Sequence, residues 1–185
     1  MTLFEYLAAA HTLILTFALT RALSGVALAI KPSRRSPLHL SWLGFIVSNW
    51  LFAFWAMWGY IDVEWTLVRF IALLTVPALM YVFISIVIPQ NPSAIESWRD
   101  YFFENRVPVF ATGALLFIAI AFSNQFIQGA SPTHSLELIL YVTIGVFSIG
   151  IVSSGARTHT ALAFWPPVFF VLILILMAQP ERLFQ

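Results

Sequence analysis

The chain has 185 residues, of which 61% are hydrophobic and only 9% charged, and its net charge is +1. Soluble domains are about 25% charged, so this chain has too few charged side chains to cover a water-soluble fold of its length. The absence of cysteine excludes disulfides and cysteine chemistry, and the near-neutral charge predicts no nucleic-acid partner. The composition therefore predicts an all-α, polytopic integral membrane protein.

Six segments are long and apolar enough to cross a membrane, for which a helix needs about 20 apolar residues. The connections between them are short, and no linker divides the chain. Residues 1–185 are therefore predicted to form a single six-helix transmembrane domain. The predicted spans are residues 4–30, 38–60, 65–89, 107–128, 135–154 and 159–179.

The first segment contains the deepest charged residue, Arg21, which lies about 15 Å along the helix from its basic end. A charged side chain at that depth costs several kcal/mol, so it needs a structural or functional reason. Helical spacing places His11 and Arg21 in one wedge, with Thr16 and Thr20 in a neighbouring stripe. We expect this polar face to look inward. It either packs against other helices or lines a path for a ligand or ion.

The third segment places Arg69 about one turn inside the end opposite the basic loops, where Trp65 can stack on its guanidinium. Four acidic residues are expected near the same level, as an outer rim of ion pairs or the wall of a vestibule. No carboxylate is predicted near the middle of a helix, which favours an anion or a small neutral solute over a cation. The predicted rim residues are Glu5, Asp62, Glu64 and Glu137.

The longest connection, residues 90–106, is expected to contain a short amphipathic helix between the third and fourth spans. Ser93 is its predicted N-cap. Trp98, Tyr101 and Phe102 would share one apolar face, opposite charged residues. Such a helix is typical of a segment that lies on the membrane surface.

The sixth segment contains two consecutive prolines, Pro166 and Pro167. Proline removes a backbone donor and clashes with the preceding turn, so the helix is predicted to break or bend there. The freed carbonyl groups must either find partners on neighbouring helices or line a wet cavity.

Basic residues in the connections indicate the orientation, because cytoplasmic loops of membrane proteins are enriched in lysine and arginine. Six of them fall in the first, third and fifth connections, and the opposite side carries only Arg182. This pattern predicts cytoplasmic odd-numbered loops and both termini on the non-cytoplasmic side, in a bacterial inner (plasma) membrane. The six basic residues are Lys31, Arg34, Arg35, Arg99, Arg106 and Arg157.

The leading functional hypothesis is a homo-oligomeric channel or small carrier for an anion or a small neutral solute. The alternative is a non-transporting scaffold or partner subunit that binds membrane lipid or another membrane protein. A haem held by histidine pairs is less favoured, because His39 begins its helix and His134 lies in a connection. No cofactor, metal site or enzymatic motif is predicted. The predicted path consists of His11, Thr16, Thr20, Arg21, Arg69, Pro166 and Pro167.

Overall fold

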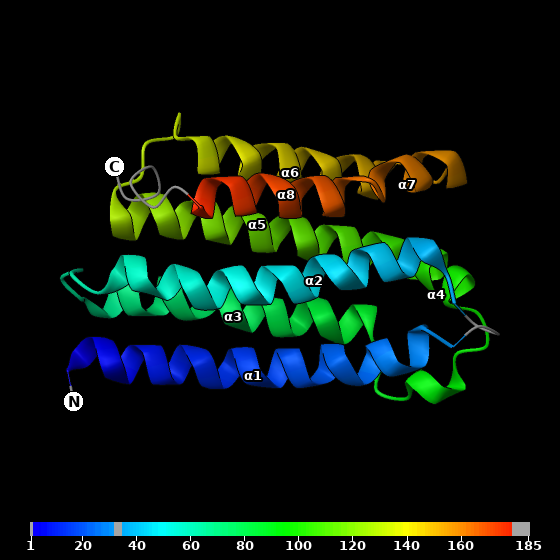
Figure 1. The fold of residues 1–185 in the computed structure, drawn as a ribbon, viewed down its shortest axis with the longest axis horizontal. Helices are drawn as coiled ribbons and strands as arrows, with labels where there is room; N and C mark the ends of the chain where they lie inside the picture. The colour runs from blue at the N-terminus through cyan, green and yellow to red at the C-terminus, as the bar shows by residue number, and fades with distance from the viewer. Residues whose placement is uncertain (1, 32–34, 179–185) are drawn as a thin grey trace.

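The fold is all-helical, as a computed structural model shows for the whole chain except residues 1, 32–34 and 179–185 (Figure 1). No β-strand occurs in the residues it describes, which confirms the predicted all-α class. The elements are α1 (Leu3–Ala29), α2 (Pro37–Ala56), η1 (Met57–Tyr60), α3 (Leu67–Val87), η2 (Pro92–Ala94), α4 (Trp98–Glu104), α5 (Arg106–Gln128), α6 (Ser135–Val152), α7 (Ala156–Leu162) and α8 (Trp165–Met177).

Six helical segments of the described chain are long and apolar enough to cross a membrane, which confirms the predicted spans at the level of length and composition. They run along the long axis of the molecule, and α7 and α8 together form the sixth (Figure 1). The segments are Leu3–Ala29, Pro37–Tyr60, Leu67–Ala94, Arg106–Gln128, Ser135–Val152 and Ala156–Met177.

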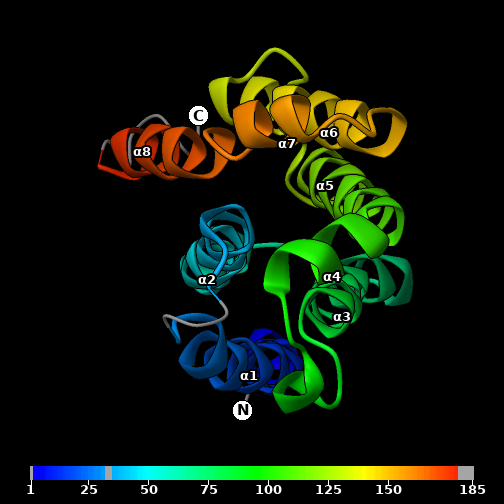
Figure 2. The ribbon, with the colours of Figure 1, turned by 90° about the vertical axis from the view of Figure 1, so that its right-hand side faces the viewer.

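The helices pack as a chain of neighbours. α1 contacts α2 and α3, α3 contacts α5, and α5 contacts α6, while α2 also reaches α8 (Figure 2). α5 and α6 pack closely against each other. There Gly113 lies under the ring of Phe147, and Gly150 lies under the ring of Phe110. A Cβ atom on Gly113 would lie 2.5 Å from Phe147 Cδ1, so these small residues permit close helix packing.

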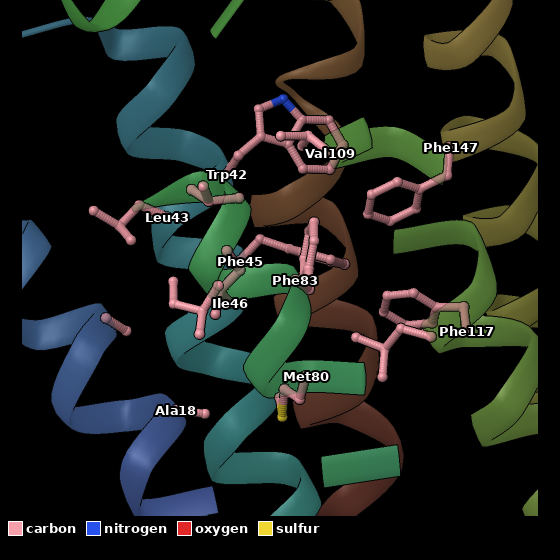
Figure 3. Close-up of a cluster of buried hydrophobic side chains, with 14 of the residues drawn as sticks. Ala18, Trp42, Leu43, Phe45, Ile46, Met80, Phe83, Val109, Phe117 and Phe147 are labelled. Carbon is pink, nitrogen blue, oxygen red and sulfur yellow. The ribbon is translucent and has the colours of Figure 1, made fainter. Parts of the chain in front are cut away.

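Toward the end of the molecule that carries Arg99 and Arg106, the interior is filled by aromatic rings that we call the aromatic core. Its members are nearly inaccessible to solvent and come from α2, α3, α5, α6 and α8 (Figure 3). Ring centroids of neighbouring members lie 5.0 to 5.9 Å apart, in edge-on, tilted and stacked pairs. The aromatic core comprises Trp42, Phe45, Phe83, Phe110, Phe117, Phe147 and Phe169.

The connection between α3 and α5 contains the short helix α4, but its N-cap differs from the prediction. Ser97 Oγ, and not Ser93, accepts the hydrogen bond from the Asp100 backbone N–H. Trp98 and Phe102 are buried inside the protein, and Trp98 stacks on His39 with ring centroids 4.5 Å apart. The apolar face of α4 therefore covers the end of the bundle.

The sixth span breaks where the two prolines predict. α7 ends at Leu162, and α8 begins at Trp165 with Pro166 and Pro167 in its first turn. Ser41 of α2 donates a hydrogen bond to the free Ala163 carbonyl oxygen, 2.6 Å away. The break is thus stabilised by a neighbouring helix.

Candidate functional site

A partly open cavity lies between the helices in the half of the bundle nearer the N-terminus, and we call it the His11 cavity. Its volume is about 110 Å³. Side chains of α1, α2, α3, α5, α6 and α8 line it, and most of them are apolar. Phe117 and Phe169 belong to both the cavity and the aromatic core, so they form the boundary between the two. The polar lining residues are His11, Asn49, Tyr60, Ser123 and Asn124.

His11 is the most unusual residue of this cavity. It is only 3% exposed, and neither Nδ1 nor Nε2 has a hydrogen-bond partner in the described part of the chain. A buried polar atom without a partner costs about 1–3 kcal/mol, so natural folds rarely leave one without a reason. The prediction that His11 faces inward is confirmed, and the structure places it against a cavity.

Beside the cavity, a hydrogen-bond network surrounds Glu137, whose side chain is 0% exposed. Asn124 Nδ2 donates to Glu137 Oε1 at 2.9 Å, and Gln125 Nε2 donates to Oε2 at 3.0 Å. Tyr60 Oη in turn donates to Asn124 Oδ1 at 3.3 Å. The expectation that Glu137 belongs to an exposed rim is therefore wrong. Two amides at the end of α5 hold the carboxyl group in the protein interior.

The other predicted rim residues lie elsewhere. Glu5 caps α1, because its carboxylate accepts from the Thr2 backbone N–H at 2.7 Å in a capping box. Asp62, Glu64 and Arg69 line one open groove at the surface. Arg69 Nη1 donates to the Glu64 backbone oxygen at 2.6 Å, so its guanidinium closes a turn at the start of α3.

Arg21 has a different environment from His11, although helical spacing places both in one wedge. Arg21 Nε donates to the Ile88 backbone oxygen at 3.0 Å, at the C-terminal end of α3. The partial negative charge of that helix end favours a cation. Tyr101 Oη donates to the nearby Ile86 oxygen at 2.6 Å. Burial raises the pKa of Tyr101 above its ordinary value, and the positive charge of Arg21 opposes part of this rise. The structure therefore gives Arg21 a helix-capping contact outside the cavity lining.

The threonine stripe of α1 faces away from the interior, contrary to expectation. Thr16 and Thr20 are exposed, and each hydroxyl donates to the backbone oxygen four residues earlier, at 2.8 and 2.9 Å. Because its own helix satisfies each hydroxyl, an outward position leaves no donor unpaired. The inner face of α1 is formed by Leu15, Ala18 and Ala22 together with His11.

Pro166 and Pro167 break the sixth span but do not line the His11 cavity. Their effect on the site is indirect, because they set the start of α8, whose residues Phe169, Ile173 and Met177 do line it. Of the predicted path residues, the structure therefore brings His11 alone into the cavity wall.

The sequence did not identify the other polar residues of the cavity wall. In the sequence, Asn49 and Asn124 look like ordinary interhelical hydrogen-bonding groups, and Tyr60 is typical of a membrane interface. A signal was present in Asn124 and Gln125, because two adjacent amides near the end of a span require buried partners. Pairing them with Glu137 required knowing that α5 and α6 form a tight hairpin.

No protein-family model, no curated protein and no solved structure matches this chain. The functional assignment therefore depends on the cavity and the groups around it.

Proposed function

We propose that this protein is a small membrane carrier for a neutral amphipathic solute about the size of a single six-membered ring. The observation that carries this proposal is the His11 cavity, with five polar side chains in an otherwise apolar wall. Intramembrane polar groups often mark a substrate path. An engineered apolar cavity of about 150 Å³ binds benzene. The His11 cavity, at about 110 Å³, fits a ligand of similar size.

The cavity wall favours a neutral solute over an anion. Within the described residues, neither lysine nor arginine lines it. The guanidinium groups of Arg21 and Arg69, the two candidates for binding an anion, donate to backbone oxygens at helix ends instead. The nearest acid, Glu137, has Asn124 and Gln125 bound to its two oxygens. Of the two kinds of solute predicted from the sequence, an anion or a small neutral molecule, the neutral molecule is therefore the one to test.

The aromatic core favours a carrier over a permanently open channel. Trp42, Phe110 and Phe147 fill the interior beyond the cavity, with ring centroids 5.0 Å apart for Trp42 and Phe110 and 5.2 Å for Trp42 and Phe147. A solute bound near His11 would cross the rest of a single chain only if these rings moved. Opening of one half and closing of the other is the alternating access expected of a carrier.

The proposed orientation follows the basic residues. Those that the structure describes in the connections, Lys31, Arg35, Arg99, Arg106 and Arg157, lie at the end away from the N-terminus, whereas Arg34 and Arg182 fall outside the described residues. The proposal places this end and the interfacial helix α4 at the cytoplasmic face of a bacterial plasma membrane, with both termini outside.

Cysteine labelling tests this orientation, because the chain has no native cysteine. A membrane-impermeant maleimide added to intact cells is expected to label Ser131→Cys, at the connection between α5 and α6. It should label Glu104→Cys, at the end of α4, only after the cells are lysed. Both positions are exposed in the structure, so the reverse pattern would show that the chain is inserted the other way.

The central experiment measures binding and flux with the same protein. Cyclohexanol should raise the unfolding temperature of the purified protein in lipid nanodiscs, and proteoliposomes in stopped-flow light scattering should take up propane-1,2-diol faster than empty liposomes. Ala56→Phe, which fills the cavity, should abolish both effects, whereas the matched Ala111→Phe on an exposed face of α5 should preserve them. Absence of binding and flux in the folded protein would refute the proposal.

The second candidate is a non-transporting partner subunit or scaffold that contacts membrane lipid or another membrane protein. It is favoured by the exposed face of α1 with Thr16, Thr20 and Ser24, since small residues promote contact between helices in membranes. The same face could join copies of this chain in the proposed homo-oligomer. Saturable binding without any flux would favour this candidate.

A further inference from the structure

We propose that the ligand of the His11 cavity carries a hydroxyl group, which both accepts a hydrogen bond from His11 and donates one to the cavity wall. This inference rests on the proposed function, because it assumes that the cavity binds a small neutral molecule. It goes further by naming the chemical class, an alcohol or phenol rather than a ketone or hydrocarbon.

His11 provides the first requirement. A neutral imidazole has one N–H donor and one nitrogen lone pair, and in the structure both nitrogens of His11 lack partners among the described residues. The side chain is 3% exposed, so bulk water does not satisfy it. A hydroxyl group can satisfy either nitrogen, because it donates and accepts. A carbonyl group can satisfy only the N–H.

The other polar residues of the cavity wall provide the second requirement. The two hydroxyl protons of the wall are already used, since Tyr60 donates to Asn124 Oδ1 at 3.3 Å and Ser123 donates to the Ala72 oxygen at 3.3 Å. Asn49 Nδ2 donates to the Phe45 oxygen at 2.8 Å, while no described residue donates to Asn49 Oδ1. The wall therefore keeps acceptor oxygens free for a ligand that brings its own proton.

Glu137 fixes this arrangement of donors and acceptors. By accepting from Asn124 Nδ2 at 2.9 Å, it orients the amide so that Oδ1 faces the Tyr60 hydroxyl. The Tyr60 proton is thereby directed to Asn124, and a lone pair of its oxygen remains available. Glu137 is a positioning residue here, because it does not line the cavity.

The test compares two ligands of nearly equal size, cyclohexanol and cyclohexanone. Dissociation constants are measured by titration calorimetry on the full chain in nanodiscs, with empty nanodiscs as the correction for lipid partition. Wild type is expected to bind the alcohol about tenfold more tightly, the effect of roughly one buried hydrogen bond. Asn49→Leu should reduce this ratio below about twofold, because it removes the free acceptor oxygen of the wall. His11→Phe should weaken the binding of both compounds to a similar extent, and Thr20→Val, on the outer face of α1, should leave both dissociation constants unchanged.

The outcomes separate this inference from the proposed function. Equal binding of both compounds, or tighter binding of the ketone, would overturn the hydroxyl inference and leave the cavity as a binding site for neutral solutes. Absence of binding by either compound would overturn both. If Asn49→Leu does not fold, the wild-type ratio alone still decides the question.

Discussion

The two halves of this bundle contain the same helices but are filled differently. In the aromatic core, Trp42, Phe45 and Phe147 are at most 1% exposed and contact one another directly. In the other half, His11 and Asn49 line the His11 cavity, whose volume is about 110 Å³. Large rigid rings fill space at little entropic cost, whereas amide and imidazole groups require partners that apolar neighbours cannot supply.

This difference separates a half whose packing stabilises the fold from a half that leaves room for the proposed ligand. Substitutions that add volume should be severe in the aromatic core and mild in the cavity. Loss of a polar group should matter most beside the cavity, where the polar groups depend on one another.

The largest effect is expected from Gly150→Val in α6. The new side chain would overlap the ring of Phe110, so we expect a loss of about 3 kcal/mol in the free energy of unfolding, at the upper end for an overpacked core. Gly145→Val is the matched control in the same helix, because no atom lies within 4 Å of a Cβ built there. Unfolding of the two variants in mixed micelles by SDS titration would measure the difference, and equal stabilities would contradict the tight α5–α6 contact.

A smaller loss, about 2 kcal/mol, is expected for Glu137→Ala, because the buried Asn124 amide would lose its acceptor and Gln125 would keep only its hydrogen bond to Tyr141 Oη. Glu64→Ala removes an exposed carboxylate at the same end of the molecule and should leave stability unchanged. The same SDS titration compares them. If both variants were as stable as wild type, the network around Glu137 would contribute nothing to the fold.

Arg21→Ala tests whether this arginine serves the fold or the path. We expect a loss of about 1 kcal/mol in stability, for one hydrogen bond to the end of α3, and a cyclohexanol dissociation constant within twofold of wild type. Arg21→Lys should recover part of the stability, since it keeps the charge near the helix end. Loss of cyclohexanol binding in a fully folded Arg21→Ala variant would show that Arg21 contributes to the proposed solute path.

The sequence was sufficient to predict the class of fold, because apolar runs of about 20 residues and adjacent prolines have strong physical consequences. The six spans, at the level of length and composition, and the break before Pro166 are therefore confirmed. The apolar side chains Trp98 and Phe102 of α4 are instead buried against the bundle. The inward position of His11 also followed from the expectation that the polar face of the first segment looks inward, although the same expectation was wrong for Thr16 and Thr20.

The rest of the candidate site required contacts between distant segments. Arg21 was assigned to the path because its depth was known but its partner, the Ile88 carbonyl, was not. Glu137 was assigned to the rim because its position near a span end suggested exposure. In the structure, two amides of α5 donate hydrogen bonds to its carboxyl group in the protein interior. Hydrogen-bond partners decide whether a polar residue at a given depth is structural or functional, and sequence spacing within one helix does not reveal them.

The smallest effect on stability is expected for Thr16→Val and Thr20→Val, within about 0.5 kcal/mol of wild type, because each hydroxyl bonds only to its own helix and faces outward. These variants therefore probe assembly with little disturbance of the fold. If this face of α1 joins copies of the chain, the double variant should shift the oligomer mass measured by light scattering, and Ala111→Val on the exposed face of α5 should not. If the mass is unchanged, the threonine face contacts lipid, and any homo-oligomer must form through another helix.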